Sequence, residues 1–268
     1  MQAALGCLTT SFIPNRRFSH RYGVLHASVP NWHGRSGVAN DLITLIRLAQ
    51  QNGWATTDAV SFDVLLRHAK PTLWPVSNRD SGPVVDLLRP TDADEAHQRS
   101  LSALVGLGEQ PLHTDGAHHV APPDYIVLSC PQGSGVPTFL WRFRSHDSDN
   151  RPVEDLRNGL FTVRAGNSCF LAPSLTITPA QLRYDPGCMS PADGRASRAS
   201  EYLNSRRAES IPFQWDTPGR VLVIDNSNVL HCRGDTSGEP GREMLRAGLK
   251  VGRMPKALRL QPAPVVRA

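Results

Sequence analysis

The sequence predicts a mainly β protein with flanking helices, in which short strands form a barrel or a jelly roll. Six short runs of β-branched and apolar residues lie between residues 124 and 251, separated by Pro, Gly, Asn or Asp. The first hundred residues carry mostly helical patterns, and a length of 268 residues suits one β-rich domain. We therefore expect a single domain over 1–268, mainly helical over 1–105 and with a β core over 106–252.

Three helices are expected before residue 106. Apolar residues at helical spacing predict the first over 40–52, and Gly53 ends it. The spaced residues are Leu42, Leu45, Ile46 and Ala49. Thr57 could cap a second helix that runs to about residue 70, and a third is expected within 92–104.

The expected strands follow in order along the second half of the chain. They cover 124–130, 138–143, 160–164, 168–171, 220–225 and 242–251. In the last run Arg242 and Arg246 fall on one face and Leu245 and Leu249 on the other. The stretch 172–218 interrupts the pattern with Pro, Gly, Ser and Arg, and holds a helix candidate at 200–207. An insertion of this length predicts a lid or binding loop.

Charge and hydropathy exclude several classes of function. The net charge is +5, from 29 basic and 24 acidic residues, but the arginines are scattered and form no stripe. A nucleic-acid-binding protein is therefore not favoured, whereas an anionic small-molecule substrate fits. No run approaches 18 apolar residues, which excludes a membrane-spanning helix.

The cysteines indicate a reducing compartment. Their number is five and no CxxC pair occurs, so neither a disulfide framework nor a zinc ribbon is expected. Cys130 and Cys169 lie in apolar runs and are expected to be buried. We predict a cytoplasmic protein. An organelle-targeting segment is the alternative, because arginines but no acidic residue precede Asp41.

The segment 111–122, PLHTDGAHHVAP, carries a candidate metal site. His113 and Asp115 are two residues apart, so at a strand end both side chains point to the same side. His231 follows the strand 220–225 and a turn, and is the best candidate for a third ligand. Two histidines and one carboxylate on one face of a metal form the facial triad of non-haem Fe(II) oxygenases. His118 and His119 could line a substrate pocket or be ordinary loop residues.

Two arginines downstream indicate an anionic ligand. Arg242 lies eleven residues after His231, and Arg246 follows four residues later on the same strand face. Two guanidinium groups that point into a barrel are costly unless an anion meets them. A dicarboxylate cosubstrate would be such an anion, because arginine pairs bidentately with a carboxylate.

The order of these motifs resembles the taurine dioxygenase and clavaminate synthase-like superfamily of Fe(II)/2-oxoglutarate oxygenases. The motifs are HTD at 113–115, GVPT at 135–138, IDNSNVLH at 224–231 and RxxxR at 242–246. The resemblance covers about residues 100–252. It implies a double-stranded β-helix, or jelly-roll, core with a lid inserted over about 172–218.

Carried over position by position, the resemblance implies a role for six residues. The implied iron ligands are His113, Asp115 and His231. Thr138 would hydrogen-bond the distal carboxylate of 2-oxoglutarate, and Arg242 would form a salt bridge with it. Arg246 matches a second arginine that lies near the cosubstrate or near an acidic group of the substrate.

The resemblance further implies the reaction. Fe(II), 2-oxoglutarate and O2 would hydroxylate an unactivated C–H of a small molecule and release succinate and CO2. An amino acid or an intermediate of secondary metabolite biosynthesis is the expected substrate. Asp115 argues against halogenation, because related halogenases have a small residue there. Desaturation, epoxidation and cyclisation stay open, as does a cupin-like metalloenzyme that does not use 2-oxoglutarate.

Overall fold

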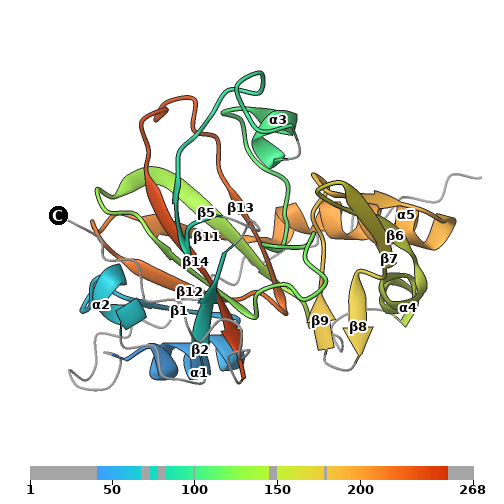
Figure 1. Cartoon of the computed structure of the whole chain (residues 1–268), viewed down its shortest axis with the longest axis horizontal. Helices are drawn as coiled ribbons and strands as arrows, with labels where there is room; N and C mark the ends of the chain where they lie inside the picture. The colour runs from blue at the N-terminus through green and yellow to red at the C-terminus, as the bar shows by residue number, and fades with distance from the viewer. Residues whose placement is uncertain are drawn as a thin grey trace, which may run out of the picture. The chain divides into compact units, whose positions relative to one another are not determined.

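Two antiparallel sheets form the framework of the molecule (Figure 1). The computed structural model describes residues 41–67, 73–77, 82–98, 100–144, 150–177 and 180–252. The larger sheet has the order β1-β12-β4-β14-β2, and β3 also pairs with β14. Its strands are β1 (Trp54–Thr57), β2 (Leu73–Val76), β3 (Val85–Leu88), β4 (Tyr125–Ser129), β12 (Val221–Asp225) and β14 (Met244–Val251). The smaller sheet consists of β11 (Ile211–Trp215), β5 (Ser134–Arg142) and β13 (Val229–Arg233).

The central strands β4 and β12 are buried along their whole length. Val221 and Val223 face one side and pack with the first helix, α1 (Leu42–Asn52). Leu222 and Ile224 face the other side and pack with residues of the smaller sheet. Both faces are covered, which explains why these strands read as continuous apolar runs. The sandwich of two antiparallel sheets is the predicted jelly roll.

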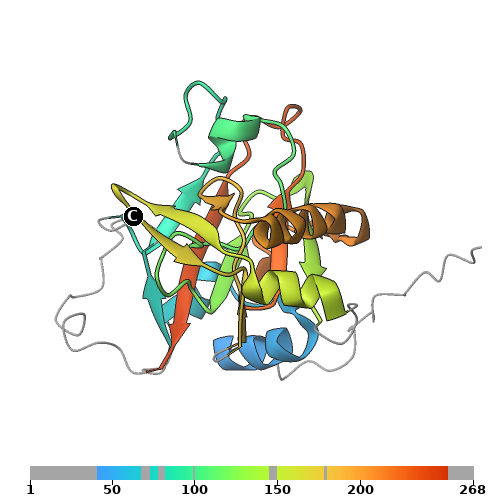
Figure 2. The same cartoon turned by 90° about the vertical axis from the view of Figure 1, so that its right-hand side faces the viewer.

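A third layer of short elements covers the outer face of the smaller sheet (Figure 2). Its strands are β6 (Phe161–Ala165), β7 (Ser168–Ala172), β8 (Leu175–Ile177), β9 (Ala180–Leu182) and β10 (Met189–Pro191). Its helices are α4 (Asn150–Asn158), α5 (Gly194–Ser205) and the 3-10 turn η1 (Arg206–Glu209). Phe161, Tyr184 and Leu203 are fully buried here, against Trp141 and Leu230 of the smaller sheet.

The helical predictions hold in part. α1 is confirmed: the Asp41 side chain caps its first turn, and Gly53 ends it with a φ of 97°. The second helix begins later than predicted, at Phe62 of α2 (Phe62–Arg67), and its predicted end near residue 70 lies outside the described residues. The third is α3 (Leu101–Val105).

That residues 1–105 are mainly helical stays a prediction, because residues 1–40 lie outside the described part. The described part of this region contains, besides α1, α2 and α3, three strands that the sequence did not predict: β1, β2 and β3. Each has only four residues, too few to show a period, and β2 contains Pro75. They become strands because β12 and β14 offer edges to pair with.

All six predicted strand runs are present, as β4, β5, β6, β7, β12 and β14. The last begins later than predicted, at Met244, so Arg242 precedes the strand, where its N–H bonds the Glu239 carbonyl. The insertion 172–218 is not one long loop. It contains β8 to β11 and α5, and β11 pairs with β5 inside the smaller sheet. α5 begins earlier than the predicted helix, at Gly194, because the Asp193 side chain accepts a hydrogen bond from the Ala196 N–H.

The described residues all belong to one compact unit. Residues 1–40 lie outside them, so a single domain over 1–268 stays a prediction, and the targeting segment considered above falls in that part. Among the described helices, none combines the length and the apolar character that a membrane crossing needs.

Candidate metal centre

His113 and His231 face each other across a pair of backbone hydrogen bonds. The His113 N–H donates to the His231 carbonyl at 3.0 Å, and the His231 N–H donates to the His113 carbonyl at 2.9 Å. This bridge attaches His113 to β13, and the two imidazole rings have centroids 4.6 Å apart. Two histidines 118 positions apart in the sequence are therefore fixed side by side by the backbone.

Asp115 completes a cluster of three buried donors. Its Oδ1 lies 3.9 Å from His113 Nε2, and its Oδ2 lies 3.8 Å from His231 Nε2. These distances exceed hydrogen-bond length, and all donor atoms lie within 4.8 Å of one another. The His113 Nδ1 is 3.0 Å from the Pro111 carbonyl, which leaves Nε2 as the lone-pair nitrogen.

The charge states of the cluster suit a divalent metal. Burial, helped by His113, lowers the pKa of His231 to about 3, so its imidazole is neutral. Burial raises the pKa of Asp115, but the nearby positive charge, above all the Arg246 guanidinium, outweighs this, so the carboxyl titrates below its usual range. Asp115 Oδ2 is buried without a hydrogen-bond partner in the described residues. A neutral imidazole at His231 and an unpartnered carboxylate oxygen at Asp115 are forms that bind metal.

Asn226 and Arg246 hold Asp115 from two sides. Asn226 bonds both the N–H and the carbonyl of Asp115. Arg246 Nη1 donates to Asp115 Oδ1 at 3.0 Å, and its Nη2 donates to Asp86 Oδ2 at 2.8 Å. The guanidinium of Arg246 is therefore already balanced by two carboxylates of the protein. Asp86 was not predicted, because nothing near it in the sequence distinguishes it.

Arg242 is a buried cation of a different kind. It is 8% exposed, and its Nη2 donates to the Val136 carbonyl at 3.3 Å. Its Nε has no hydrogen-bond partner, and no carboxylate of the described residues forms a salt bridge with it. Burial lowers its pKa. A buried guanidinium without a counter-ion is costly, so this position suits an anionic ligand.

A cavity of about 940 Å³ connects the cluster with Arg242. The predicted site residues that line it are His113, Asp115, Thr138, His231, Arg242 and Arg246. His118 and His119 also line it, so both belong to the wall of the candidate substrate pocket.

The cavity wall also holds ionisable residues that sequence reasoning missed, among them Asp185 and Arg233. Burial raises the pKa of the Asp185 carboxyl, which accepts a hydrogen bond from the Gly187 N–H. Arg233 donates to the carbonyls of Gly106 and Gly108. Its place two residues after His231 was the one available signal, since alternate residues of a strand share a face.

The described cysteines are free thiols. Cys130 is buried as predicted, but Cys169 is exposed, because β7 turns most of its residues outward. Cys232 is fully buried in the apolar cluster on the side of β13 opposite to His231. Cys7 lies outside the described residues.

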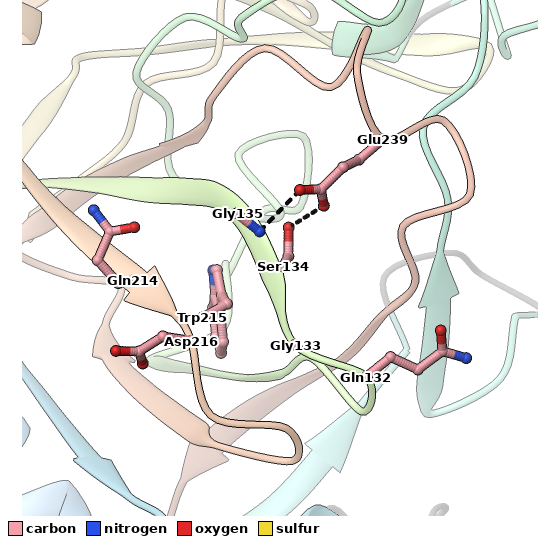
Figure 3. Close-up of a pocket in the computed structure, with 8 residues that line it drawn as sticks. All are labelled: Gln132, Gly133, Ser134, Gly135, Gln214, Trp215, Asp216 and Glu239. Carbon is pink, nitrogen blue, oxygen red and sulfur yellow. Dashed lines mark hydrogen bonds between the residues drawn. The ribbon is translucent and has the colours of Figure 1, made fainter.

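A second cavity, of about 520 Å³, lies at the start of β5 (Figure 3). Glu239 is part of its wall, and the carboxylate is satisfied there: it accepts hydrogen bonds from Ser134 Oγ at 2.6 Å and from the Gly135 N–H at 2.9 Å. These bonds tie the start of β5 to the segment that leads to Arg242.

No protein-family model matches the sequence, and no curated protein matches it. Solved structures do. The chain is similar to an asparagine oxygenase in complex with Fe(II), 2S,3S-3-hydroxyasparagine and succinate, at 19% identity and a TM-score of 0.52, over 64% of this chain and 58% of that one. It is similar to the non-heme iron oxygenase OrfP with Fe, succinate and (3S)-hydroxy-L-Arg, at 18% identity and a TM-score of 0.57, over 83% of each chain. At these identities the likeness establishes a common jelly-roll fold.

Proposed function

We propose that the chain is an Fe(II)- and 2-oxoglutarate-dependent oxygenase that hydroxylates an unactivated C–H of a small molecule. One observation carries the proposal: a buried His–His–Asp cluster shares its cavity with Arg242, a buried cation that forms no salt bridge with a described carboxylate. A metal site alone would suit many enzymes. A metal site beside an unpaired buried guanidinium suits one whose cosubstrate is an anion.

His113, Asp115 and His231 would hold the iron. Three protein ligands leave positions open for a chelating cosubstrate and for O2. Bound iron and 2-oxoglutarate would supply the oxidation: one oxygen atom of O2 would enter the substrate C–H as C–OH, and the other would enter succinate as 2-oxoglutarate loses CO2. A structure of OrfP with Fe and alpha-ketoglutaric acid, similar at 18% identity and a TM-score of 0.54, supports this choice of cosubstrate.

Arg242 and Thr138 would hold the distal carboxylate of 2-oxoglutarate. Arg242 bonds the carbonyl of Val136, two residues before Thr138 on the same strand, so the two side chains belong to one wall. For Arg246 we propose a different role from the one that the resemblance implies. Its bonds to Asp86 and Asp115 favour orienting the iron ligand over binding the cosubstrate.

The substrate would be an amino acid or a natural-product intermediate. The similar structures contain hydroxylated asparagine and hydroxylated arginine, which supports a small molecule with an amino-acid backbone. The cavity would be shared by cosubstrate and substrate, and its arginines would suit a substrate that bears an anionic group. We further propose that the protein acts in the cytoplasm as one domain.

Anaerobic titration of the purified protein with Fe(II) and then 2-oxoglutarate tests the proposal. The iron chelate should show a weak visible charge-transfer band. His113→Ala and His231→Ala should abolish iron binding while the fold stays largely intact. Arg242→Ala should lose the band at a 2-oxoglutarate concentration that saturates the wild type. Folded, iron-loaded protein without a band would contradict the proposal and favour a metalloenzyme that does not use 2-oxoglutarate.

A further inference from the structure

We propose that Trp215 is a positioning residue for the cosubstrate: its indole N–H turns the Thr138 hydroxyl into a hydrogen-bond donor for the distal carboxylate of a dicarboxylic 2-oxo acid. The inference rests on the proposed function and extends it, because it names the residue that would make the site select a dicarboxylate. Trp215 carries no site motif, and nothing in the sequence singles it out.

The side chains of Trp215 and Thr138 form a direct hydrogen bond that is shielded from solvent. Trp215 Nε1 donates to Thr138 Oγ1 at 2.9 Å. Trp215 is fully buried and Thr138 is 4% exposed, so water does not compete for this bond. An indole nitrogen can only donate, whereas a hydroxyl has one proton and two lone pairs. The bond therefore occupies a lone pair of Thr138 and leaves the hydroxyl proton to bond another acceptor.

A bulge between β11 and β5 places the indole there. Phe213 pairs with Thr138, so a regular ladder would set Trp215 opposite Val136. Instead the register shifts, and Trp215 pairs with Ser134. Gln214 and Asp216 point to the opposite side from the Trp215 ring (Figure 3). Bulges commonly re-aim a side chain next to a functional site, and this one directs the indole at Thr138.

Neighbouring contacts make the wall rigid. The Phe213 and Trp215 rings meet edge to face with centroids 4.8 Å apart. Glu239 bonds the start of β5, and its carbonyl accepts the N–H of Arg242 at 3.1 Å. The strand β5 therefore connects the three residues: Trp215 bonds its Thr138, and Glu239 links its start to Arg242. The donor direction of Thr138 would be set before the cosubstrate arrives, which lowers the cost of binding.

This arrangement predicts a selective effect. Only the distal carboxylate of 2-oxoglutarate would reach Thr138, while the 2-oxo and near carboxylate groups would bind the iron. Pyruvate carries a 2-oxo group and the adjacent carboxylate but has no distal carboxylate. Loss of the indole N–H should therefore weaken the binding of 2-oxoglutarate and leave the binding of Fe(II) and of pyruvate unchanged.

Trp215→Phe tests this in the iron-loaded protein under anaerobic conditions. The dissociation constant of 2-oxoglutarate, followed by the visible band, should rise about five- to tenfold, as expected for the loss of one hydrogen bond between neutral groups. Trp141→Phe is the matched control, because Trp141 is also buried but packs in a different cluster against Phe143 and Tyr202. It should leave the constant unchanged.

A double-mutant cycle shows whether Trp215 acts through Thr138. Thr138→Val keeps the shape and removes the hydroxyl, so adding Trp215→Phe to it should cause no further loss of 2-oxoglutarate affinity. Independent, additive losses would overturn the proposal. So would an unchanged affinity in Trp215→Phe, or an equal weakening of Fe(II), pyruvate and 2-oxoglutarate, which would indicate packing alone.

A measurement on the wild type covers the case in which Trp215→Phe does not fold. With Zn(II) in the metal site, 2-oxoglutarate should shift the indole N–H resonance of Trp215 in ¹⁵N-tryptophan-labelled protein, and pyruvate should not. No shift on saturation with 2-oxoglutarate would overturn the proposal. A wild-type protein that binds iron but no 2-oxoglutarate at all would instead contradict the proposed function.

Discussion

The side chain of Asn226 holds the backbone of Asp115 on both sides. Asn226 Oδ1 accepts the Asp115 N–H at 2.9 Å, and Asn226 Nδ2 donates to the Asp115 carbonyl at 3.0 Å and to the Pro123 carbonyl at 2.8 Å. Asn226 is fully buried in the turn between β12 and β13, and β13 carries His231. One turn therefore fixes two of the three candidate iron ligands relative to each other.

Asn226→Ala should weaken iron binding, although Asn226 is not itself a candidate iron ligand. It leaves three buried backbone groups without partners, which should lower the free energy of unfolding by about 2–4 kcal/mol. Loss of an outer support of a ligand should reduce Fe(II) affinity about 10- to 100-fold. Fe(II) titration below the unfolding transition measures this. Asn228→Ala is the control, because Asn228 bonds Asp225 and Ser227 in the same turn; an equal loss of affinity in both variants would contradict the role of Asn226.

Arg246→Gln and Arg242→Gln should separate two functions. Arg246 holds Asp115 Oδ1, so its loss should reduce Fe(II) affinity about 10- to 100-fold, and 2-oxoglutarate affinity little at saturating iron. Arg242→Gln should instead reduce 2-oxoglutarate affinity and change Fe(II) affinity little. Asp86→Asn removes the second partner of Arg246 and should resemble Arg246→Gln in direction. Should Arg246→Gln affect only 2-oxoglutarate, Arg246 would instead contact the cosubstrate.

Arg183→Met should loosen the loop that follows Asp115. The buried guanidinium of Arg183 donates to the carbonyls of Ala117, His119 and Val120, at 2.6, 2.6 and 2.9 Å. Without it three carbonyls lose their partner, so the protein should lose about 3 kcal/mol of stability in urea unfolding, and amides over 116–122 should exchange faster. Arg183→Lys keeps the charge but not the several donors of the guanidinium, so its stability should lie between those of the wild type and Arg183→Met. Unchanged exchange in Arg183→Met would exclude this role.

The ion pair between Asp155 of α4 and Arg198 of α5 should make stability depend on pH. Arg198 donates to both carboxylate oxygens, at 2.8 and 2.7 Å, and lowers the pKa of Asp155. A lowered pKa in the folded state adds stability above the unfolded pKa of about 4, and this stability is lost as the pH falls through the folded value. Asp155→Asn should therefore be less stable than the wild type at pH 7 and nearly equal to it near pH 2.

Urea unfolding at several pH values between 2 and 7 measures this difference. Glu154→Gln is the matched control, because it removes the same charge one residue away on an exposed side chain. It should show a smaller difference from the wild type across the same range. A difference for Asp155→Asn that did not shrink on acidification would show that the carboxylate acts through something other than its charge.

Local sequence patterns were sufficient for the strands that build the centre of the molecule. β4 and β12 consist mostly of apolar residues because both of their faces are covered. The apolar stripe of α1 and its cap lie within one short segment. The HTD motif placed two candidate ligands on one side of the chain by spacing alone. For each of these features, the determining residues are neighbours in the sequence.

The tertiary structure decided what depends on residues far apart. β1, β2 and β3 are too short to show a pattern and become strands only through their partners in the larger sheet. Asp86 reaches Arg246 across 160 positions and Asn226 reaches Asp115 across 111. Trp215 bonds Thr138 beside a register shift between β11 and β5 that no spacing in the sequence reveals.

The sequence alone therefore determined the fold class and the candidate ligands, because periodicity and motif spacing act over a few residues. Which arginine has its charge balanced by the protein, and which is left for a ligand, was decided by the folded chain. Arg242 and Arg246 were predicted on one strand and read alike in the sequence, but only Arg246 lies on β14, which begins at Met244. Strand register brings two carboxylates to Arg246 and none of the described ones into a salt bridge with Arg242, and the environment of a buried charge sets its role.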